Sequence, residues 1–401
     1  MLKGKRVLIG VSGGIAAYKI PYLVRLFKKA DAEVRCILSP SASSFVTPLT
    51  LATLSENEVH TELFNPLTGS WTNHVELGLW ADLMVIAPLT ASTLSKLVSG
   101  HSDNLLLTTY LSAKCPVVVA PAMDLDMYAH AATQENLATI KGRGVFVLDA
   151  EEGELASGLV GKGRMAEPEQ IFEYTSFVLA QKQGRLTGKK ILITAGPSYE
   201  ALDPVRFIGN HSTGKMGIAI AYQFALENAQ VTLILGPSHE TVPNLPNICI
   251  VRVQAAEEMM RATEQYWPSS DIGIFSAAVA DYRPKDIAKE KIKKSNDILH
   301  VEMMKNPDIL AWAGQNKSNH QYLVGFALET ENEFENAQAK LNRKNLDLIV
   351  LNSLRNSGAG FGHNTNQVSF ISKDNKITNF ELLLKSQVAE NLVNYVIENI
   401  S

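Results

Sequence analysis

Cysteine is scarce in this sequence. Its 401 residues include three cysteines, Cys36, Cys115 and Cys249, which lie far apart and form no CxxC pair. We therefore expect neither a disulfide framework nor a zinc site, and the cysteine usage is that of a cytoplasmic protein.

Long apolar runs and excess positive charge are also missing. No apolar run reaches the roughly 20 residues that a membrane-spanning helix needs. The opening "MLKGKRVLIG" enters a strand pattern at once and lacks the layout of a signal peptide. The 37 Lys and Arg residues are outnumbered by 41 Asp and Glu residues, for a net charge of −4. Neither a membrane nor nucleic acid is therefore an expected partner.

Length and an internal repetition indicate two domains. A single core seldom grows past about 250–300 residues. The stretches "GKRVLIGVSGG" (4–14) and "GKKILITAGPS" (188–198) both run from Gly-Lys through an apolar strand into a glycine loop. Helical and strand patterns alternate after each, which predicts α/β domains with mainly parallel sheets. A polar connector near Gly184–Thr187 divides residues 1–184 from residues 188–401.

Small polar residues follow the predicted strands of the first half. The loops "SGGIAA", "SPSAS", "APLTAST" and "APAMD" come directly after apolar segments. The carboxyl ends of parallel strands meet at one edge of a sheet, where ligands of such folds bind. The first loop lacks the G-x-G-x-x-G spacing, so an ordinary dinucleotide site is not expected.

The stretch "GNHSTGKMG" (209–217) is close to a P-loop but differs from one in two ways. Met216 stands where a P-loop has its magnesium-binding hydroxyl, and the preceding strand ends near Thr194, too far upstream for the P-loop turn. We expect Ser212 or Thr213 to cap a helix that starts near Gly214, whose free N–H groups would bind an anion. The stretch is predicted to be a phosphate cradle of another kind.

An ordered set of motifs across nearly the whole chain supports a family resemblance. "GVSGGIAAYK", "TNHVELGLWAD", "APLTAST", "SDNLLLTTYLSA", "PAMDLDMY" and "GLVGKGRM" resemble the flavin-binding cysteine decarboxylases of coenzyme A synthesis. "TAGPSYEALDPVRFIGNHSTGKMG", "AAVADYRP", "EKIKK", "KNPDIL", "GFALET" and "RKNLDLIV" resemble phosphopantothenate–cysteine ligases. The whole chain is thus similar to the bifunctional phosphopantothenoylcysteine decarboxylase/phosphopantothenate–cysteine ligases.

The resemblance implies a fold and two activities. It implies two Rossmann-like domains, a flavodoxin-like FMN domain and a nucleotide-binding ligase domain. The ligase would join 4′-phosphopantothenate to L-cysteine through an acyl-cytidylate, using CTP and Mg²⁺. The FMN domain would then decarboxylate the product to 4′-phosphopantetheine. Trimers through the first domain and dimers through the second, and hence a dodecamer, are implied as well.

For the first half, the resemblance implies a set of site residues. His74 matches the catalytic base, which suits the near-neutral titration of imidazole. Met123, Lys162 and Arg164 match substrate-binding positions. The residues that match FMN-contacting positions are Ser12, Gly13, Gly14, Ser39, Thr90 and Asn104.

Two catalytic positions of the first half depart from the family pattern. Asp124 stands where the family has an Asn that holds the substrate carboxylate, and Ser157 stands where it has a Cys that delivers the last proton. A serine hydroxyl is a far weaker acid than a thiol. Our hypothesis is that Asp124, protonated beside the substrate carboxylate, takes over part of this work.

For the second half, the resemblance assigns Asn210 to the substrate and the acyl-cytidylate, and Lys291 of "EKIKK" to catalysis. The glycine- and asparagine-rich stretch 356–367 is expected to be an active-site loop. No metal ligands are identified. The residues that match the CTP pocket are Ser276, Ala277, Asp281, Lys291, Asn306, Pro307, Asp308, Ile309, Phe326, Lys340 and Lys344.

Two alternatives remain open from the sequence. The chain could be a ligase only, with its first half a flavin-binding oligomerisation module. Fold analogy alone would also allow a nucleotide-sugar or dinucleotide oxidoreductase.

Overall fold

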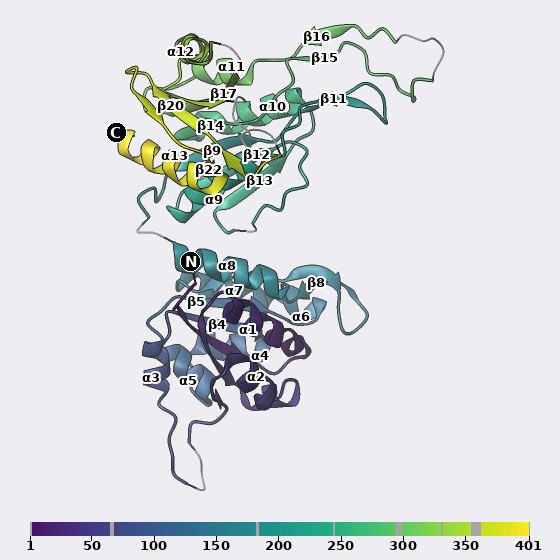
Figure 1. Ribbon diagram of the computed structural model, residues 1–401. Coiled ribbons are helices and arrows are strands. Elements are labelled where there is room, and N and C mark those ends of the chain that lie inside the picture. Colours follow the sequence, from purple (N-terminus) through teal and green to yellow (C-terminus); the bar gives the residue numbers. More distant parts are fainter. Residues whose placement is uncertain are drawn as a thin grey trace. The chain divides into compact units, whose positions relative to one another are not determined.

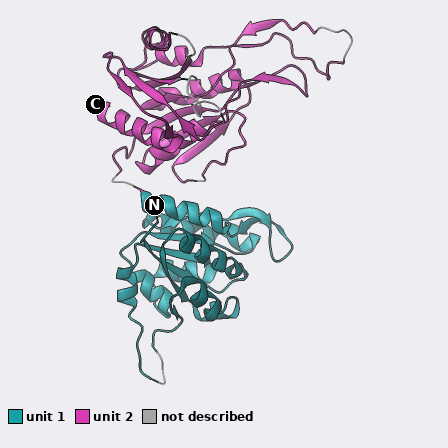
Figure 2. Ribbon diagram, viewed as in Figure 1, with its two compact units in different colours: residues 1–180 teal, residues 181–401 magenta. Residues whose placement is uncertain are grey.

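The computed structural model describes residues 2–64, 68–181, 184–243, 245–293, 299–329, 332–353 and 362–400. Its contacts divide the chain into unit 1, residues 1–180, and unit 2, residues 181–401 (Figure 2). The division falls just before the predicted connector at Gly184–Thr187. Within the described parts of the chain, every helix is too short or too polar to span a membrane.

Unit 1 is built on a six-stranded parallel sheet with the order β3-β2-β1-β4-β5-β6 (Figure 1). Its strands are β1 (Arg6–Val11), β2 (Glu33–Leu38), β3 (Val59–His60), β4 (Leu83–Leu89), β5 (Val117–Pro121) and β6 (Phe146–Val147). Without the two-residue edge strand β3, the order is that of flavodoxin-like folds; with it, the order is that of a Rossmann fold. In either case the strand order reverses between β1 and β4.

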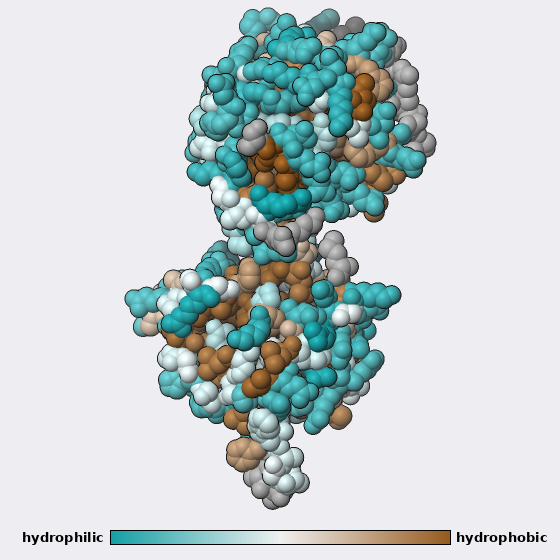
Figure 3. Space-filling model, turned by 90° about the vertical axis from the view of Figure 1, so that its left-hand side faces the viewer, coloured by the Kyte–Doolittle hydropathy of each residue, from teal (hydrophilic) through white to brown (hydrophobic). Residues whose placement is uncertain are grey.

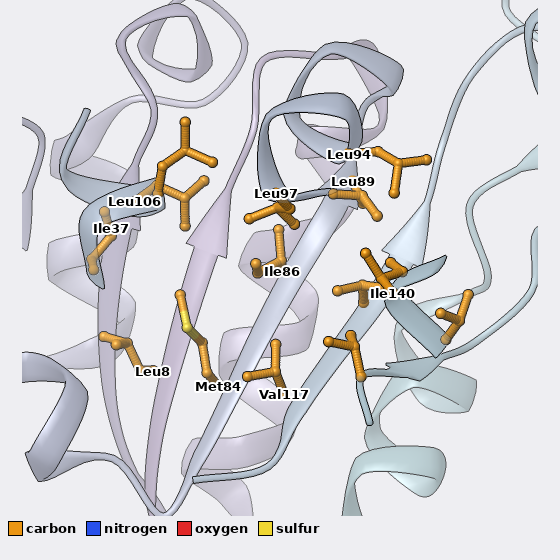
Figure 4. Close-up of a cluster of buried hydrophobic side chains, with 14 of the residues drawn as sticks. Leu8, Ile37, Met84, Ile86, Leu89, Leu94, Leu97, Leu106, Val117 and Ile140 are labelled. Atoms are coloured by element: carbon orange, nitrogen blue, oxygen red, sulfur yellow. The ribbon is translucent and has the colours of Figure 1, made fainter. Parts of the chain in front are cut away.

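Helices cover both faces of this sheet. The helical segments of unit 1 are η1 (Ile15–Lys19), α1 (Ile20–Lys29), η2 (Pro40–Ser44), α2 (Pro48–Ser55), α3 (His74–Trp80), α4 (Ala91–Ser99), α5 (Leu105–Ser112), α6 (Leu125–Ala129), α7 (Ala131–Gly142) and α8 (Pro168–Ala180). A hairpin of β7 (Glu151–Glu154) and β8 (Val160–Arg164) stands outside the sheet. On one face, Leu8, Met84 and Ile86 pack against leucines of α4 and α5 (Figure 4). Strands buried on both faces explain the continuous apolar runs of β1 and β4.

Unit 2 has the same kind of sheet with two additional strands at one edge. Its eight-stranded sheet has the order β13-β12-β9-β14-β17-β18-β20-β21, in which the first six strands are parallel and the last two antiparallel. These strands are β9 (Lys190–Ala195), β12 (Gln230–Leu235), β13 (Ile248–Arg252), β14 (Ile272–Phe275), β17 (Tyr322–Glu329), β18 (Leu348–Ser353), β20 (Val368–Ser372) and β21 (Ile377–Asn379). The predicted α/β class with mainly parallel sheets is confirmed in both units.

The remaining elements of unit 2 are helices and small hairpins. The helical segments are α9 (Lys215–Leu226), α10 (Ala256–Tyr266), η3 (Trp267–Ser269), α11 (Ile309–Gln315), α12 (Glu333–Arg343) and α13 (Lys385–Asn399). The hairpins pair β10 (Tyr199–Ala201) with β11 (Phe207–Gly209), β15 (Tyr282–Pro284) with β16 (Met303–Lys305), and β19 (Thr365–Asn366) with β22 (Leu383–Leu384). Strands β11, β15 and β16 extend away from the main sheet (Figure 1).

Trp267 anchors one face of the unit 2 sheet. Its side chain is fully buried, its indole N–H donates to Ala313 O at 3.0 Å, and its ring meets Phe275 edge-on at 6.1 Å. Glycine at position 273 makes room for it, because a Cβ there would lie 2.5 Å from the indole ring.

We predict that Trp267→Ala lowers the free energy of unfolding of unit 2 by about 3–5 kcal/mol, since it leaves a cavity and an unpaired carbonyl. Trp267→Phe should cost about 1–3 kcal/mol, because it chiefly removes the hydrogen bond. Urea unfolding followed by far-UV circular dichroism measures both. An equal loss for both variants would contradict the account of cavity formation.

Candidate functional site

The described residues of unit 1 enclose a cavity of about 930 Å³ at the carboxyl ends of the sheet strands. We call it the unit 1 cavity. Its volume lies within the range of about 300–1,000 Å³ that is typical of small-molecule sites. The predicted residues that line it are Gly13, Gly14, Ser39, Thr90, Asn104, Met123, Asp124, Ser157 and Arg164.

Ser12 lies next to this cavity and is fully buried. Its hydroxyl donates to Pro88 O at 2.6 Å and accepts from Thr90 N at 3.1 Å, so it ties the end of β1 to the end of β4. Ser12 does not line the cavity itself but joins two strand ends that are followed by the lining residues Gly13 and Thr90. The next residue, Gly13, lies so close to η2 that a Cβ would be 2.2 Å from Ser41 Oγ.

The polar lining fits a flavin mononucleotide. Ser39 Oγ is buried and has no hydrogen-bond partner, so it is available to a ligand at this edge. Thr90 and Asn104 each cap the helix that follows, and both line the cavity. Hydroxyls, an amide and close-packed glycine backbone suit a phosphate and a polar ring system.

Asp124 and Ser157 also line the cavity, and Ser157 lies in the turn between β7 and β8. The Asp124 carboxylate accepts from Leu125 N at 2.7 Å and faces the cavity. Arg164 donates to Glu167, which also accepts from the buried ammonium of Lys19 at 2.9 Å. Sequence reasoning missed Lys19, which lines the cavity and ties the base of the hairpin to η1.

His74 and Lys162 do not line this cavity. His74 is the first residue of α3, its ring lies edge-on to Trp71 at 6.0 Å, and its Nδ1 atom is buried without a partner. The Lys162 ammonium lies 5.6 Å from the centre of the Tyr128 ring. Within one chain, the structure therefore separates the predicted base from the predicted flavin-binding residues.

In unit 2 a cavity of about 200 Å³, here called the Asn306 cavity, brings most of the predicted nucleotide residues together. Asn306 is fixed by its side-chain bond to Ala280 O at 2.8 Å. Lys344 donates to Asp308 at 2.8 Å, and Lys340 donates to Phe326 O at 2.9 Å. The predicted residues that line it are Ala277, Asp281, Asn306, Pro307, Asp308, Ile309, Phe326, Lys340 and Lys344.

The Asp308 carboxylate is kept charged beside these lysines. Burial is the largest single influence and would raise its pKa, but the hydrogen bonds from Lys344 and Ala311 N together with the charges of Lys344 and Lys340 outweigh it, and the pKa lies below its usual value. Asp308 also caps α11 by accepting from Ala311 N at 3.0 Å. The Asn306–Ile309 segment is therefore fixed both to a helix and to a cation.

A second cavity of unit 2, of about 370 Å³, opens at the start of α9; we call it the Gly214 cavity. It shares Asp281, Phe326 and Lys340 with the Asn306 cavity, so the two adjoin. Asn210 and Ser276 line it; Asn210 donates to Ala278 O, and Ser276 donates to Thr194 O, both at 2.8 Å.

The start of α9 confirms one expectation and corrects another. The helix begins at Lys215, directly after Gly214. The predicted cap by Ser212 or Thr213 is wrong: Gly214 is the N-cap, with a left-handed φ of +83°, and among the described residues no side chain caps the helix. Glycine takes this conformation without strain, and residues 214–217 at the start of the helix line the cavity.

Lys291 lines neither cavity of unit 2. It is exposed and next to Ile292, whose N–H donates to the buried carboxylate of Asp203 at 3.1 Å and whose carbonyl accepts from Arg206 at 2.9 Å. The hydrogen bonds from Arg206 hold the pKa of Asp203 far below its usual range. Lys291 thus belongs to the extension that contains β10, β11, β15 and β16.

One predicted segment lies partly outside the described residues, and some residues that line the Gly214 cavity were not predicted from the sequence. Residues 356–361 of the predicted active-site loop lie outside the described residues. In the described ranges, no group of three or more His, Cys, Asp or Glu side chains could hold a metal ion. Asn352 and Lys385 line the Gly214 cavity but lie in ordinary strand and helix patterns, so no sequence signal selects them, whereas Asn366, which also lines it, belongs to the predicted active-site loop.

Two family models together match nearly the whole chain. The flavoprotein family model matches residues 1–179, and the model of the DNA/pantothenate metabolism flavoprotein C-terminal domain matches residues 186–400. A solved structure of the C-terminal domain of a coenzyme A biosynthesis bifunctional protein is 37% identical, covers 54% of this chain and 97% of its own, and has a TM-score of 0.46.

Relatives match over most of the chain. A cysteine/cysteine sulfinic acid decarboxylase from an unknown prokaryotic organism is 49% identical, over 88% of this chain and 99% of its own. The coenzyme A biosynthesis bifunctional protein CoaBC of Haemophilus influenzae is 44% identical, over 99% of this chain and 98% of its own. The chain belongs to the family of coenzyme A biosynthesis bifunctional proteins.

Proposed function

We propose that this chain catalyses two consecutive steps of coenzyme A synthesis. Unit 2 joins 4′-phosphopantothenate to L-cysteine at the expense of CTP, and unit 1 decarboxylates the product to 4′-phosphopantetheine. The proposal rests on one observation: a single chain of this family has cavities at the carboxyl edges of both sheets. The three cysteines are free, which agrees with a cytoplasmic location.

In unit 2 the reaction begins when the substrate carboxylate attacks the α-phosphorus of CTP and pyrophosphate leaves. The amine of cysteine then attacks the acyl carbon, displaces CMP and loses a proton. Lys340 and Lys344 stand beside the Asn306 cavity, where they would neutralise phosphate charge, helped by Mg²⁺ that arrives with the nucleotide. Asn210 is held by Ala278 O and would orient the acyl group.

In unit 1, Gly13, Gly14, Ser39, Thr90 and Asn104 would hold FMN. The flavin, when bound, accepts two electrons from the thiol side of the substrate and returns them after CO₂ has left. His74 would take the proton released in the first half of this cycle. Asp124 would bind the substrate carboxylate and give back a proton, with Ser157 closing the cavity on its hairpin.

Homo-oligomers would bring the separated residues to their cavities. Trp71, Val75, Leu79 and Leu111 form an exposed apolar surface, the α3–α5 patch, beside His74. Figure 3 faces the side of Figure 1 on which α3 and α5 are labelled, and apolar residues gather there on unit 1. We infer that this patch forms the trimer contact and offers His74 to the cavity of a second copy.

The extension of unit 2 that contains β10, β11, β15 and β16 would likewise form a contact between two chains. Its exposed apolar side chains are Val205, Phe207, Tyr282 and Met304. Pairing of two extensions would bring Lys291 to the cavities of the partner chain. Trimers of unit 1 and dimers of unit 2 would together build a dodecamer.

A second candidate for unit 1 is the decarboxylation of free cysteine. The observation that favours it is the relative named cysteine/cysteine sulfinic acid decarboxylase, at 49% identity. Mass spectrometry of the products separates the candidates. The purified protein with 4′-phosphopantothenate, cysteine, CTP and Mg²⁺ should yield 4′-phosphopantetheine, whereas cysteine alone should not yield cysteamine.

Lys291→Gln should leave formation of the acyl-cytidylate partly intact and slow amide formation by about 100-fold or more, since it removes a cation from the second step. Single-turnover quench with labelled CTP measures both steps. Lys289→Gln is the matched control, because Lys289 is exposed on the same segment. Amide formation at full speed in Lys291→Gln would remove this residue from the mechanism.

Asn210→Asp should instead reduce the acyl-cytidylate itself, because it adds negative charge beside phosphate. The same quench experiment detects this difference. Accumulation of the intermediate in Asn210→Asp would contradict the role given to Asn210.

His74→Asn should keep the FMN absorbance yet lower CO₂ release by about 10²–10⁴-fold, as expected for loss of a general base. Ligation should continue unchanged, and His101→Asn, at an exposed position, is the control. Co-expression of His74→Asn with Gly13→Val, whose side chain would collide with Ser41, should restore part of the activity if His74 serves a second copy. No recovery in mixed oligomers would rule out the shared site.

Asp124→Asn should lower decarboxylation by about tenfold or more, or allow oxidised enethiol product to accumulate, because the remaining Ser157 is a weak acid. Adding Ser157→Cys should restore 4′-phosphopantetheine. Chromatography of the thiol products measures both effects. If the wild-type protein releases no CO₂, unit 1 is a flavin-binding module and the ligase-only alternative stands.

A further inference from the structure

Glu154 lines the unit 1 cavity, and the reaction proposed above gives it no role. It is the last residue of β7, and the turn that follows it carries Ser157, which lines the same cavity. Backbone hydrogen bonds close this turn: Leu155 N donates to Leu159 O at 2.8 Å, and Gly158 N donates to Leu155 O at 2.9 Å. Glu154 and Ser157 are therefore held at the same end of the hairpin.

The other two glutamates of β7 are placed differently. Glu151 accepts a hydrogen bond at 2.5 Å from a glutamine of α8, and Glu152 lies opposite Lys162 in the β7–β8 ladder. Neither of them lines the cavity. Glu154 lies opposite Val160, so its neighbour in the ladder offers it no cation. Of these three side chains, Glu154 is the one placed at the cavity.

The hairpin is fixed to the segment that carries Asp124. Strand β8 lies beside α6, the helix that follows Asp124 (Figure 1). Met123 N donates to Gly163 O at 3.0 Å. Glycine is needed on this strand, because a Cβ at position 163 would lie 2.4 Å from Met123 O. This close packing brings Asp124 and Glu154 to one cavity from two different elements.

The charges of the cavity favour a proton on these two carboxyl groups. The remaining charged side chains that line the cavity form ion pairs; they are Lys19, Lys96, Asp103 and Arg164. Within the described ranges, neither Asp124 nor Glu154 belongs to an ion pair. Like charges in one site favour the protonated form of a carboxyl group, and an anionic substrate adds to this effect.

The proton balance of the decarboxylation requires two acids. Loss of CO₂ from the oxidised substrate leaves an enethiolate. Its conversion to the thiol adds a proton to the carbon that lost CO₂, a hydride to the carbon bonded to sulfur, and a proton to the sulfur. The hydride is the one removed from that carbon before CO₂ leaves, so no further reductant is needed. Asp124, which would hold the carboxylate, is placed to serve the first carbon, and the sulfur needs a second donor.

We propose that Glu154 is this second donor and protonates the sulfur as the hydride returns. The hydroxyl of Ser157 is too weak an acid for this step near neutral pH. Glu154 is exposed, so its carboxylate can take a new proton from water after each transfer. The inference rests on the decarboxylase function proposed for unit 1. It assigns one carboxyl group to carbon and the other to sulfur.

The ratio of two products tests this role in the full-length protein with bound FMN and supplied 4′-phosphopantothenoylcysteine. Glu154→Gln should release CO₂ in the first turnover as wild type does. It should raise the ratio of oxidised enethiol to 4′-phosphopantetheine by about tenfold or more, as expected for loss of a general acid. Without oxygen, the flavin of this variant should stay reduced and lose its yellow colour, because the hydride is not returned. Chromatography and absorbance measure both effects.

Three further variants separate proton donation from a structural role. Glu152→Gln, at an exposed position of the same strand, should match wild type. Glu154→Asp should keep part of the thiol product. Adding Ser157→Cys to Glu154→Gln should restore that product, because a thiol at the same end of the hairpin is an acid near neutrality. A side chain that only shaped the hairpin would not be replaced by a thiol at another position.

The outcomes distinguish this inference from the function on which it rests. CO₂ release with an unchanged product ratio in Glu154→Gln would remove Glu154 from the reaction and leave the decarboxylase function in place. Loss of CO₂ release in Glu154→Gln that Ser157→Cys does not reverse would assign Glu154 to folding or substrate binding, and would also overturn the inference. If wild type with bound FMN releases no CO₂, the decarboxylase function fails and the inference fails with it.

Discussion

The direction of the parallel strands is the constraint on which both units depend. Strands that run the same way place all their carboxyl ends at one edge, and crossover helices cover both faces. In each unit the first strand lies inside the sheet, and the strand order reverses beside it, between β1 and β4 and between β9 and β14. The loops that leave these neighbouring strands diverge, and the candidate cavities occupy the space between them.

The two units place different kinds of side chain at this edge of the sheet. Unit 1 uses hydroxyls, glycine backbone and an unpartnered Ser39, which suits a flavin that stays bound and provides its own reactivity. Unit 2 uses lysines, helix starts and amides, which suit phosphates that arrive and leave with each turnover. The common architecture thus sets where ligands bind, and the loop chemistry sets which ligands they are.

Each unit also keeps a predicted catalytic residue away from its own cavity. His74 stands at the start of α3 beside an apolar patch, and Lys291 stands on an extension fixed by Asp203. Both residues are beside exposed apolar side chains, so the same surfaces that would join chains would also complete the sites. Such assembly would link oligomerisation to activity and would account for cavities that lack these two residues within a single chain.

Much of the fold follows from the sequence by itself. Continuous apolar runs such as "LMVIAP" are typical of strands buried on both faces, and their alternation with helical patterns indicates parallel sheets. The motif order also identified most of the residues that line the cavities, because loops after parallel strands converge wherever the strands lie. Only the tertiary structure separated Ser12, His74, Lys162 and Lys291 from those cavities, and replaced the expected serine or threonine cap of α9 with Gly214. Lys385 had no signal in the sequence, since its place at the Gly214 cavity arises from burial beside Lys215. Periodicity determines which residues face the core, but burial and distance between remote residues are decided only when the chain has folded.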